Sequence, residues 1–250
     1  CHIKFGEEYA LLAGDGLLTR AFGLMTESKV SPEAIVKAVS LLSELAGANG
    51  MIGGQVVDLM NEEIALAKAG KEAYIALKLN SLTDKVLIDK MIECSKAGVK
   101  IDCVIRGISC LVAGIPGETE NIHIRSIVGR FLEHARIYIF GVGDRQKVYI
   151  SSADFMTRNT ERRVEVAAPV KNPIIKARLI VMFNMMLADN VKARLQLPDG
   201  TYEKRSATQG EEPLDTQLYF YKSAYKKAEQ LVPKKKKKGA ISSLKSLFKK

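Results

Sequence analysis

A strand, a helix and a second strand follow one another between residues 73 and 105, and this succession limits the possible folds more than any other part of the sequence. Residues 73–79, AYIALKL, alternate like a buried strand, and residues 84–98 have helical periodicity that ends at Gly98. Residues 99–105, VKIDCVI, form the next expected strand. Strands joined through a helix run parallel, and parallel sheets are covered on both faces. We therefore predict an α/β domain.

The rest of the chain surrounds this unit with further elements. We expect strands at 122–128, 135–140, 147–151 and 163–168, helices at 172–190 and 215–231, and a turn with a short hairpin at LPDGTYEKR. Residues 1–59 have only helical patterns, and the second of these opens with Ser31 as N-cap and Pro32 at the first helical position. The pattern changes near residue 60, which predicts a boundary there. The chain starts at Cys1 rather than Met, so we expect a fragment.

The positive charge belongs to one end of the chain. The net charge is +10, but eight of the 38 Lys and Arg lie in the last eighteen residues, which contain no acid. The remainder has 30 basic and 28 acidic groups, which argues against a protein that binds nucleic acid over its whole surface. The tail, residues 233–250, is compatible with a disordered segment, or with contacts to an anionic membrane surface or a polyphosphate chain.

The four cysteines show neither zinc-ligand spacing nor a disulfide framework, so reduced thiols are expected. No apolar run approaches the roughly 18 to 20 residues that cross a bilayer, and no signal peptide is recognised. These features predict a cytoplasmic protein, with membrane association through the tail as the alternative.

Arginines recur around the predicted strand ends, whereas phosphate-binding loops of the GxxxxGK[ST] or GxGxxG type are missing from the sequence. The group comprises Arg106, Arg125, Arg130, Arg136, Arg158, Arg162 and Arg163. The carboxyl ends of parallel strands meet at one crevice, where guanidinium groups bind phosphate well. His134 lies between Arg130 and Arg136, where an imidazole could exchange a proton with a phosphoryl oxygen. The alternative is a structural histidine paired with Glu133 or a backbone carbonyl.

Several distinctive blocks between residues 60 and 231 carry a resemblance to a known family. The blocks NSL, RGI, SIVGRFLEH, YISSAD and RN resemble the C-terminal catalytic region of polyphosphate kinases. The resemblance implies a phospholipase D-like α/β fold, with a mixed sheet flanked by helices. It also implies transfer of the terminal phosphate of ATP to polyphosphate through a phosphohistidine, with Mg²⁺. The family's phosphohistidine lies in a preceding half that has no counterpart here.

The same resemblance assigns roles to individual residues. His134, in FLEH, is implied as the catalytic proton donor or phosphate contact. ATP or phosphate contacts are implied for Arg106, in RGI, and for Arg163, in RRVE, and are extended to Arg136 and Arg158. His134-Ala-Arg136 stands where phospholipase D-type enzymes have HxK. The small polar residues of SSADFMTRN are expected near the site, and they are Ser152, Asp154 and Asn159.

A second resemblance covers residues 1–59, where CHIKFGEEYALLAGDGLLTRAF and GGQVVDL are similar to the middle of polyprenyl diphosphate synthases. Asp15 and Asp58 are isolated, so the Asp-rich metal motifs of that family are missing. We expect a helical fragment at 1–59, a kinase domain at 60–232 and a Lys-rich tail.

Three functions remain open at this point: a polyphosphate kinase fragment that uses ATP or ADP and polyphosphate, a non-catalytic polyphosphate or nucleotide-binding module, and a polyprenyl synthase remnant. Homo-oligomerisation is a further option.

Overall fold

The computed structural model describes residues 7–46, 54–161 and 165–231. Its helices are α2 (Glu7–Thr26), α3 (Pro32–Ala46), α4 (Gly54–Lys68), α5 (Lys85–Lys96), α6 (Thr157–Glu161), α7 (Pro173–Ala188) and α8 (Thr216–Leu231). Its strands are β1 (Tyr74–Leu79), β2 (Lys100–Ile105), β3 (Ile122–Ile127), β4 (Arg136–Phe140), β5 (Lys147–Ser151), β6 (Ala167–Pro169), β7 (Ala193–Gln196) and β8 (Tyr202–Lys204). Within these ranges the strands form one eight-stranded sheet, in the order β6-β5-β4-β1-β2-β3-β7-β8.

The sheet is mixed. β1, β2 and β3 run parallel, which confirms the predicted strand-helix-strand unit, and all the other pairs are antiparallel. The sheet is therefore not the purely parallel one that residues 73–105 alone suggest. It is the mixed sheet flanked by helices that the family resemblance implies.

One predicted strand, 163–168, begins later than expected. β6 starts at Ala167, because the amide of Val166 donates to the Ser152 hydroxyl oxygen at 3.0 Å instead of to a strand carbonyl. The Ser152 amide still donates to the Val166 carbonyl oxygen at 2.9 Å, so the Ser152 hydroxyl replaces one of the two backbone hydrogen bonds expected at this position.

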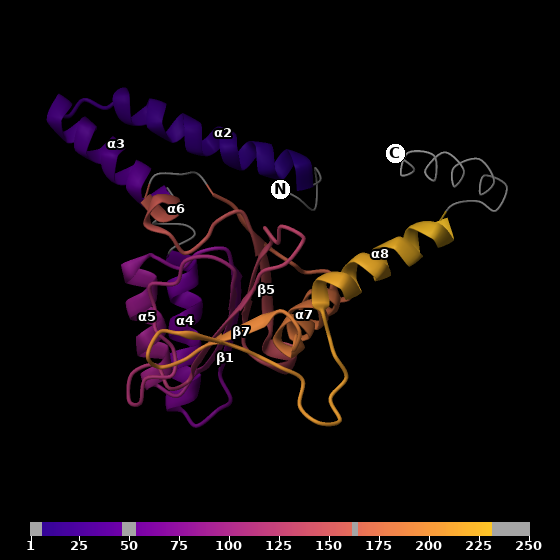
Figure 1. Cartoon of the computed structure of the whole chain (residues 1–250). Coiled ribbons are helices and arrows are strands. Elements are labelled where there is room, and N and C mark those ends of the chain that lie inside the picture. The colour runs from indigo at the N-terminus through magenta and orange to yellow at the C-terminus, as the bar shows by residue number, and fades with distance from the viewer. Residues whose placement is uncertain (1–6, 47–53, 162–164, 232–250) are drawn as a thin grey trace.

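Helices α4 and α5 cover one face of the sheet (Figure 1). Val56, Leu59, Met60 and Ile64 of α4 are buried against apolar side chains of β1, β2 and α5. Helix α5 begins at the N-cap Asp84, whose carboxylate accepts the amide hydrogen of Leu87 at 3.0 Å. These apolar positions have helical spacing, so burial of one stripe explains both helices.

Helix α7 covers the opposite face, and α8 reaches this face with its first turns before it extends away from the sheet (Figure 1). Helix α7 starts at the N-cap Asn172 and contributes the buried Phe183 and Met186 to a second, smaller core. Asp189, directly after α7, accepts hydrogen bonds from the amides of residues 191–193 and from the amide and hydroxyl of Thr216. This carboxylate therefore joins the end of α7 to the starts of β7 and α8.

The N-terminal helices α2 and α3 lie beside each other, away from the sheet (Figure 1). Ser31 caps α3 as expected, because its hydroxyl accepts the amide hydrogen of Ala34 at 3.3 Å. Helix α4 crosses the predicted division between residues 59 and 60, and that division stays a prediction. Within the described ranges, no helix has the length and apolar character that a transmembrane segment requires.

Candidate functional site

Most of the predicted site residues lie at one edge of the sheet. Because β4 runs antiparallel to β1, it starts where β1 and β2 end. Strand β5 runs antiparallel to β4 and returns the chain to the same edge, where Arg136 pairs with Ser151. Segments that are far apart in sequence, at residues 80–81, 106, 134–136 and 152–154, are brought together there.

A continuous series of hydrogen bonds connects Arg106 to His134. The Nε of Arg106 donates to Oδ1 of Asn80 at 2.7 Å, and the backbone amide of Asn80 donates to Oδ1 of Asp154 at 2.6 Å. The other Asp154 oxygen accepts from Arg136 at 2.7 Å, and Arg136 in turn lies 3.2 Å from Nδ1 of His134. Two guanidinium groups and one imidazole are thus held in a single network.

Asp154 is the anionic centre of this network. Burial alone would raise the pKa of its carboxyl group, but hydrogen bonds from Arg136 and Asn80 and the charge of Arg136 outweigh burial and lower the pKa. The carboxylate is therefore ionised at neutral pH. Its contacts with Arg136 and with the amides of Asn80 and Ser81 occupy both oxygens. Its role in this geometry is to orient arginine and asparagine side chains.

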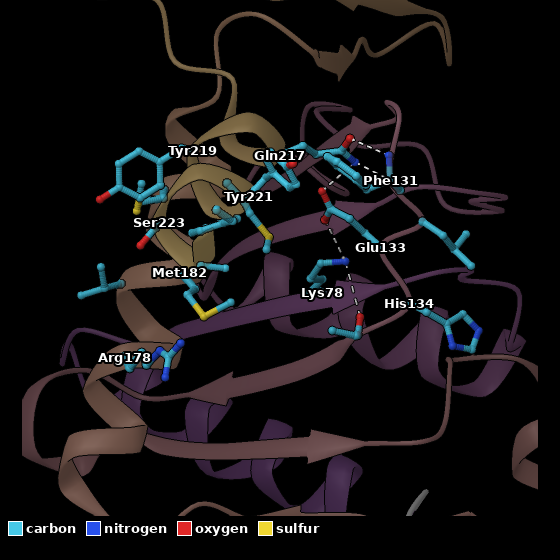
Figure 2. Close-up of a pocket in the computed structure, with 17 residues that line it drawn as sticks. Lys78, Phe131, Glu133, His134, Arg178, Met182, Gln217, Tyr219, Tyr221 and Ser223 are labelled. Atoms are coloured by element: carbon cyan, nitrogen blue, oxygen red, sulfur yellow. Dashed lines mark hydrogen bonds and ion pairs between the residues drawn. The ribbon is translucent and has the colours of Figure 1, made fainter. Parts of the chain in front are cut away.

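The ring of His134 is exposed at the start of β4. In Figure 2 the ring points away from Lys78. A guanidinium group can only donate hydrogen bonds, so the contact with Arg136 assigns Nδ1 as the acceptor and the ring proton to Nε2. The Nε2–H group is then available to an oxygen of a bound ligand. His134 is therefore not a core histidine, and its role in phosphate binding stays a prediction.

Gly107 allows the Arg106 and Asn80 segments to approach closely. Its amide donates to the Asn80 carbonyl oxygen at 2.9 Å, and a Cβ atom at position 107 would lie 2.7 Å from that oxygen. A side chain at this position would force the two segments apart. The glycine of the RGI block is therefore explained by close backbone packing.

The remaining predicted residues lie around this network or outside it. Ser152 and Asn159 both donate to the carboxylate of Glu165, so they secure the segment after β5 and contact neither arginine. Arg158 is exposed on the short helix α6. Arg162 and Arg163 lie outside the described residues.

Two arginines of the predicted group lie outside the network from Arg106 to His134. Arg125 lies within β3, and its guanidinium donates to the carbonyl oxygen of Leu187 at the end of α7. Arg130 lies in the loop before β4, over the ring of Phe131. The expectation that all these arginines converge is wrong for Arg125, because a side chain in the middle of a strand faces a covering helix instead of the strand ends.

The donor set does not suit a magnesium ion. Among the described residues, no three His, Cys, Asp or Glu side chains are grouped as metal ligands. Mg²⁺ prefers carboxylate and water oxygens in octahedral geometry, and both oxygens of Asp154 already accept hydrogen bonds from this network.

Sequence reasoning missed Asn80, although the NSL block lies directly after a predicted strand and an amide there could bridge two strand ends. It also missed Lys78, Glu133 and Gln217, which line a pocket of about 700 Å³ between the 131–135 loop, α7 and α8 (Figure 2). Lys78 is a buried cation, and its ammonium nitrogen lies 3.3 Å from Glu133. Burial lowers the pKa of Lys78, and Glu133 offsets part of this effect. Gln217 has no local sequence signal, because it is more than 80 residues from its partners.

Comparisons with known proteins agree with the resemblance of residues 60–231. The family described as Polyphosphate kinase C-terminal domain 2 matches residues 45–217. Polyphosphate kinase from Bacillus anthracis is 47% identical over 175 residues, which cover 70% of this chain and 25% of that protein. Polyphosphate kinase from Lactiplantibacillus plantarum is 48% identical over 165 residues, with 66% and 23% covered.

Among solved structures, polyphosphate kinase from Porphyromonas gingivalis has a TM-score of 0.66 at 36% identity, with 71% of this chain and 27% of that chain covered. The chain spans about a quarter of the length of the curated relatives it matches. These matches give no support to the polyprenyl synthase resemblance of residues 1–59, and the family match begins inside that range.

Proposed function

Because the chain belongs to the polyphosphate kinase family, we propose that it binds the phosphates of ATP and polyphosphate and takes part in phosphoryl transfer between them. The observation that carries this proposal is the network from Arg106 through Asn80, Asp154 and Arg136 to His134. Catalysis of phosphoryl transfer is mostly positioning and stabilisation of charge, and this network offers both.

Arg106 and Arg136 have distinct roles in this proposal. The Nε of Arg106 is occupied by Asn80, while its terminal nitrogens remain to bind nonbridging phosphate oxygens. Arg136 is tied to Asp154 and His134, so its main role is to orient the imidazole. His134 then donates its Nε2–H to an oxygen of the transferred phosphoryl group or of the leaving phosphate. Arg158 and Arg163 are further phosphate contacts in this proposal.

Two components of the reaction, the phosphohistidine and the Mg²⁺ ligands, would come from parts of the enzyme beyond the described residues. The phosphohistidine that receives the ATP phosphate belongs to the preceding half of the family's enzymes. Mg²⁺ neutralises phosphate charge in reactions of this class. Since the described carboxylates do not suit it, its ligands would come from elsewhere, and no step here depends on it.

Binding of inorganic tripolyphosphate, measured by titration calorimetry, tests the phosphate site. We expect Arg106→Ala and His134→Ala each to weaken binding by about tenfold, because each removes a charge-assisted or directed hydrogen bond. Arg20→Ala is the matched control, since Arg20 is exposed on α2, which lies away from the sheet (Figure 1). An equal loss in Arg106→Ala and in the control would mean that the response to Arg106→Ala reflects only net charge.

Incubation with γ-labelled ATP tests turnover. Growth of a labelled polymer that disappears in His134→Ala supports catalysis by this chain. Retention of nucleotide or polyphosphate without polymer growth supports the second candidate, a binding module. Polymer growth that is unchanged in His134→Ala would exclude this histidine from the mechanism.

Location in the cytoplasm, contact of the Lys-rich tail with anionic surfaces and homo-oligomerisation remain predictions. The tail lies outside the described residues. Retention on a polyphosphate column, compared with and without residues 234–250, tests its contribution. Equal retention would exclude the tail from polyanion binding.

A further inference from the structure

The loop that carries His134 is poorly packed on its inner side. Residues 131–135 form one wall of the 700 Å³ pocket (Figure 2). Phe131 and Leu132 are 42% and 73% exposed. A loop that borders a hollow has fewer van der Waals contacts to determine its conformation. The ring of Phe131 stacks on Tyr221 of α8, and polar contacts hold the rest of the loop.

Gln217, in the first turn of α8, makes three of these contacts. Its Oε1 accepts the amide hydrogen of Phe131 at 3.1 Å, and its Nε2 donates to the Phe131 carbonyl oxygen at 2.9 Å. The same Nε2 donates to Oε1 of Glu133 at 3.0 Å. The side chain thus pairs with the loop backbone as a neighbouring strand would. Gly129 leaves room for it, because a Cβ there would lie 2.4 Å from Oε1 of Gln217.

Lys78 holds the loop on both sides of His134. Its ammonium nitrogen lies 3.3 Å from Oε2 of Glu133 and 3.5 Å from the Ala135 carbonyl oxygen. Glu133 therefore uses one carboxylate oxygen for Gln217 and the other for Lys78. The residues immediately before and after His134 are both tied to β1 through one buried side chain.

The start of α8 is itself firmly placed. Asp189, which is fully buried, accepts hydrogen bonds from the amide and hydroxyl of Thr216, the residue before Gln217. Gln217 is 7% exposed. The side chain that contacts the loop therefore projects from a fixed point.

We infer that Gln217 is a positioning residue, which acts through Phe131 and Glu133 to hold the 131–135 loop so that His134 stays beside Arg136. The inference rests on the proposed function of His134 in phosphate binding. Gln217 lies on the pocket side of the loop and touches neither the arginines nor the ligand position. Its effect on phosphate binding must pass through the loop.

The experiment compares two glutamines that make the same kind of contact. Gln196 accepts the amide hydrogen of Ala113 at 3.0 Å and donates to the Leu111 carbonyl oxygen at 3.2 Å, so it secures a different loop. Gln217→Ala and Gln196→Ala each remove one such pair. Tripolyphosphate affinity is measured by calorimetry, and amide hydrogen exchange of the 129–136 and 111–113 segments by mass spectrometry.

In Gln217→Ala we expect tripolyphosphate to bind five- to tenfold more weakly, a factor that corresponds to about the net free energy of one buried hydrogen bond. We also expect faster amide hydrogen exchange over residues 129–136. In Gln196→Ala we expect faster exchange at 111–113 and unchanged affinity. Equal affinity in both variants, or an equal loss in both, overturns the inference.

A charge exchange adds a second arm. Gln217→Glu places two carboxylates together and should weaken binding more than Gln217→Ala does. Glu133→Gln restores the pairing of a donor with an acceptor between positions 217 and 133, but by itself it also removes the counter-charge of Lys78. The loss of affinity caused by Gln217→Glu should therefore be smaller in the Glu133→Gln background than in the unmodified chain. If Gln217→Ala does not fold, this comparison replaces it, and an equal loss in both backgrounds overturns the inference.

The two proposals fail in different ways. If the unmodified chain does not bind tripolyphosphate, the proposed function fails. The positioning role is then decided by exchange at residues 133–136. Acceleration in Gln217→Ala alone upholds it, and unchanged exchange overturns it.

Discussion

The helices on the two faces of the sheet contact it in different ways, with mainly apolar contacts on one face and more polar contacts on the other. Against α4 and α5 the sheet presents buried apolar side chains such as Leu77, Leu79 and Ile101. Against α7 and α8 the apolar core is smaller, a hollow of about 700 Å³ remains, and Asp189, Gln217 and the Lys78–Glu133 pair supply buried polar contacts. The face under α4 and α5 therefore depends mainly on buried apolar area, although Glu63 of α4 makes buried polar contacts with Tyr74 and Arg145. The other face depends more on a few directed contacts, which also place the His134 loop.

The largest expected effect tests the apolar face. Leu77→Ala should lower the free energy of unfolding by about 3–5 kcal/mol, because Leu77 is fully buried and its truncation leaves a cavity. Met182→Ala, in the wall of the pocket, should cost less than about 1 kcal/mol, because its side chain already borders empty space. Urea unfolding of both variants measures the contrast. Equal losses would show that the two faces are packed alike.

The next effect tests the polar face at Asp189. Asp189→Asn should cost about 3 kcal/mol, because the amide group cannot accept all the hydrogen bonds that residues 191–193 and Thr216 donate to the carboxylate. Urea unfolding at pH 7 measures this loss. Asp199→Asn, in the exposed turn before β8, is the control and should change little.

The loss at Asp189 should also depend on pH. Burial would raise the pKa of Asp189, but hydrogen bonds from Thr216 and from the amides of Lys192 and Val191 outweigh it and lower the pKa below the usual 3.8. A carboxyl group with a lowered pKa stabilises the fold fully above its unfolded value and loses this contribution as the pH falls below it. The difference between the unmodified chain and Asp189→Asn should be constant above about pH 5 and shrink below 3.8. A difference that stays constant down to pH 3 would contradict this account.

A smaller effect is expected at the Lys78–Glu133 pair. Glu133→Gln should cost about 2 kcal/mol, because it leaves the ammonium of Lys78 buried without its counter-charge, while partial exposure of Glu133 limits the loss. Adding Lys78→Met removes that stranded charge and should recover at least half of the stability. Denaturant unfolding of the single and double variants checks the expectation. A double variant less stable than Glu133→Gln would show that Lys78 is held mainly by other contacts.

The smallest effect concerns a polar contact on the outside of the apolar face. Lys85 and Asp89 form an ion pair at 2.6 Å on the exposed side of α5. Asp89→Asn should change the free energy of unfolding by less than about 0.5 kcal/mol, since exposed pairs are screened by solvent. A larger loss of stability would show that an exposed polar contact on this face contributes as much as the buried polar contacts on the other face.

The same contrast explains what could be predicted from the sequence. Helices α5 and α7 and strands β1 to β5 follow from apolar periodicity, because burial of a face imposes regular spacing. Arg106 could be placed because it directly follows a buried strand. The contacts of Gln217 and Lys78 could not, because they join residues more than 50 positions apart without a repeating pattern.

The role of Asn80 could be predicted only in part from the sequence. Its place after β1 was visible in the sequence, but its link between Arg106 and Asp154 depends on the distance between two strand ends. The antiparallel placement of β4 and β5 was also hidden, although it brings Arg136 and Asp154 to the same edge as Arg106.

Gly107 has a consequence for saturation mutagenesis. Only 2.7 Å separate a Cβ at this position from the Asn80 carbonyl oxygen, so every replacement collides with the main chain, alanine included. A scan of all twenty amino acids across residues 78–82 and 104–109 should therefore find that Gly107 tolerates the fewest substitutions. A design effort on this scaffold should leave position 107 unchanged and diversify its neighbours instead.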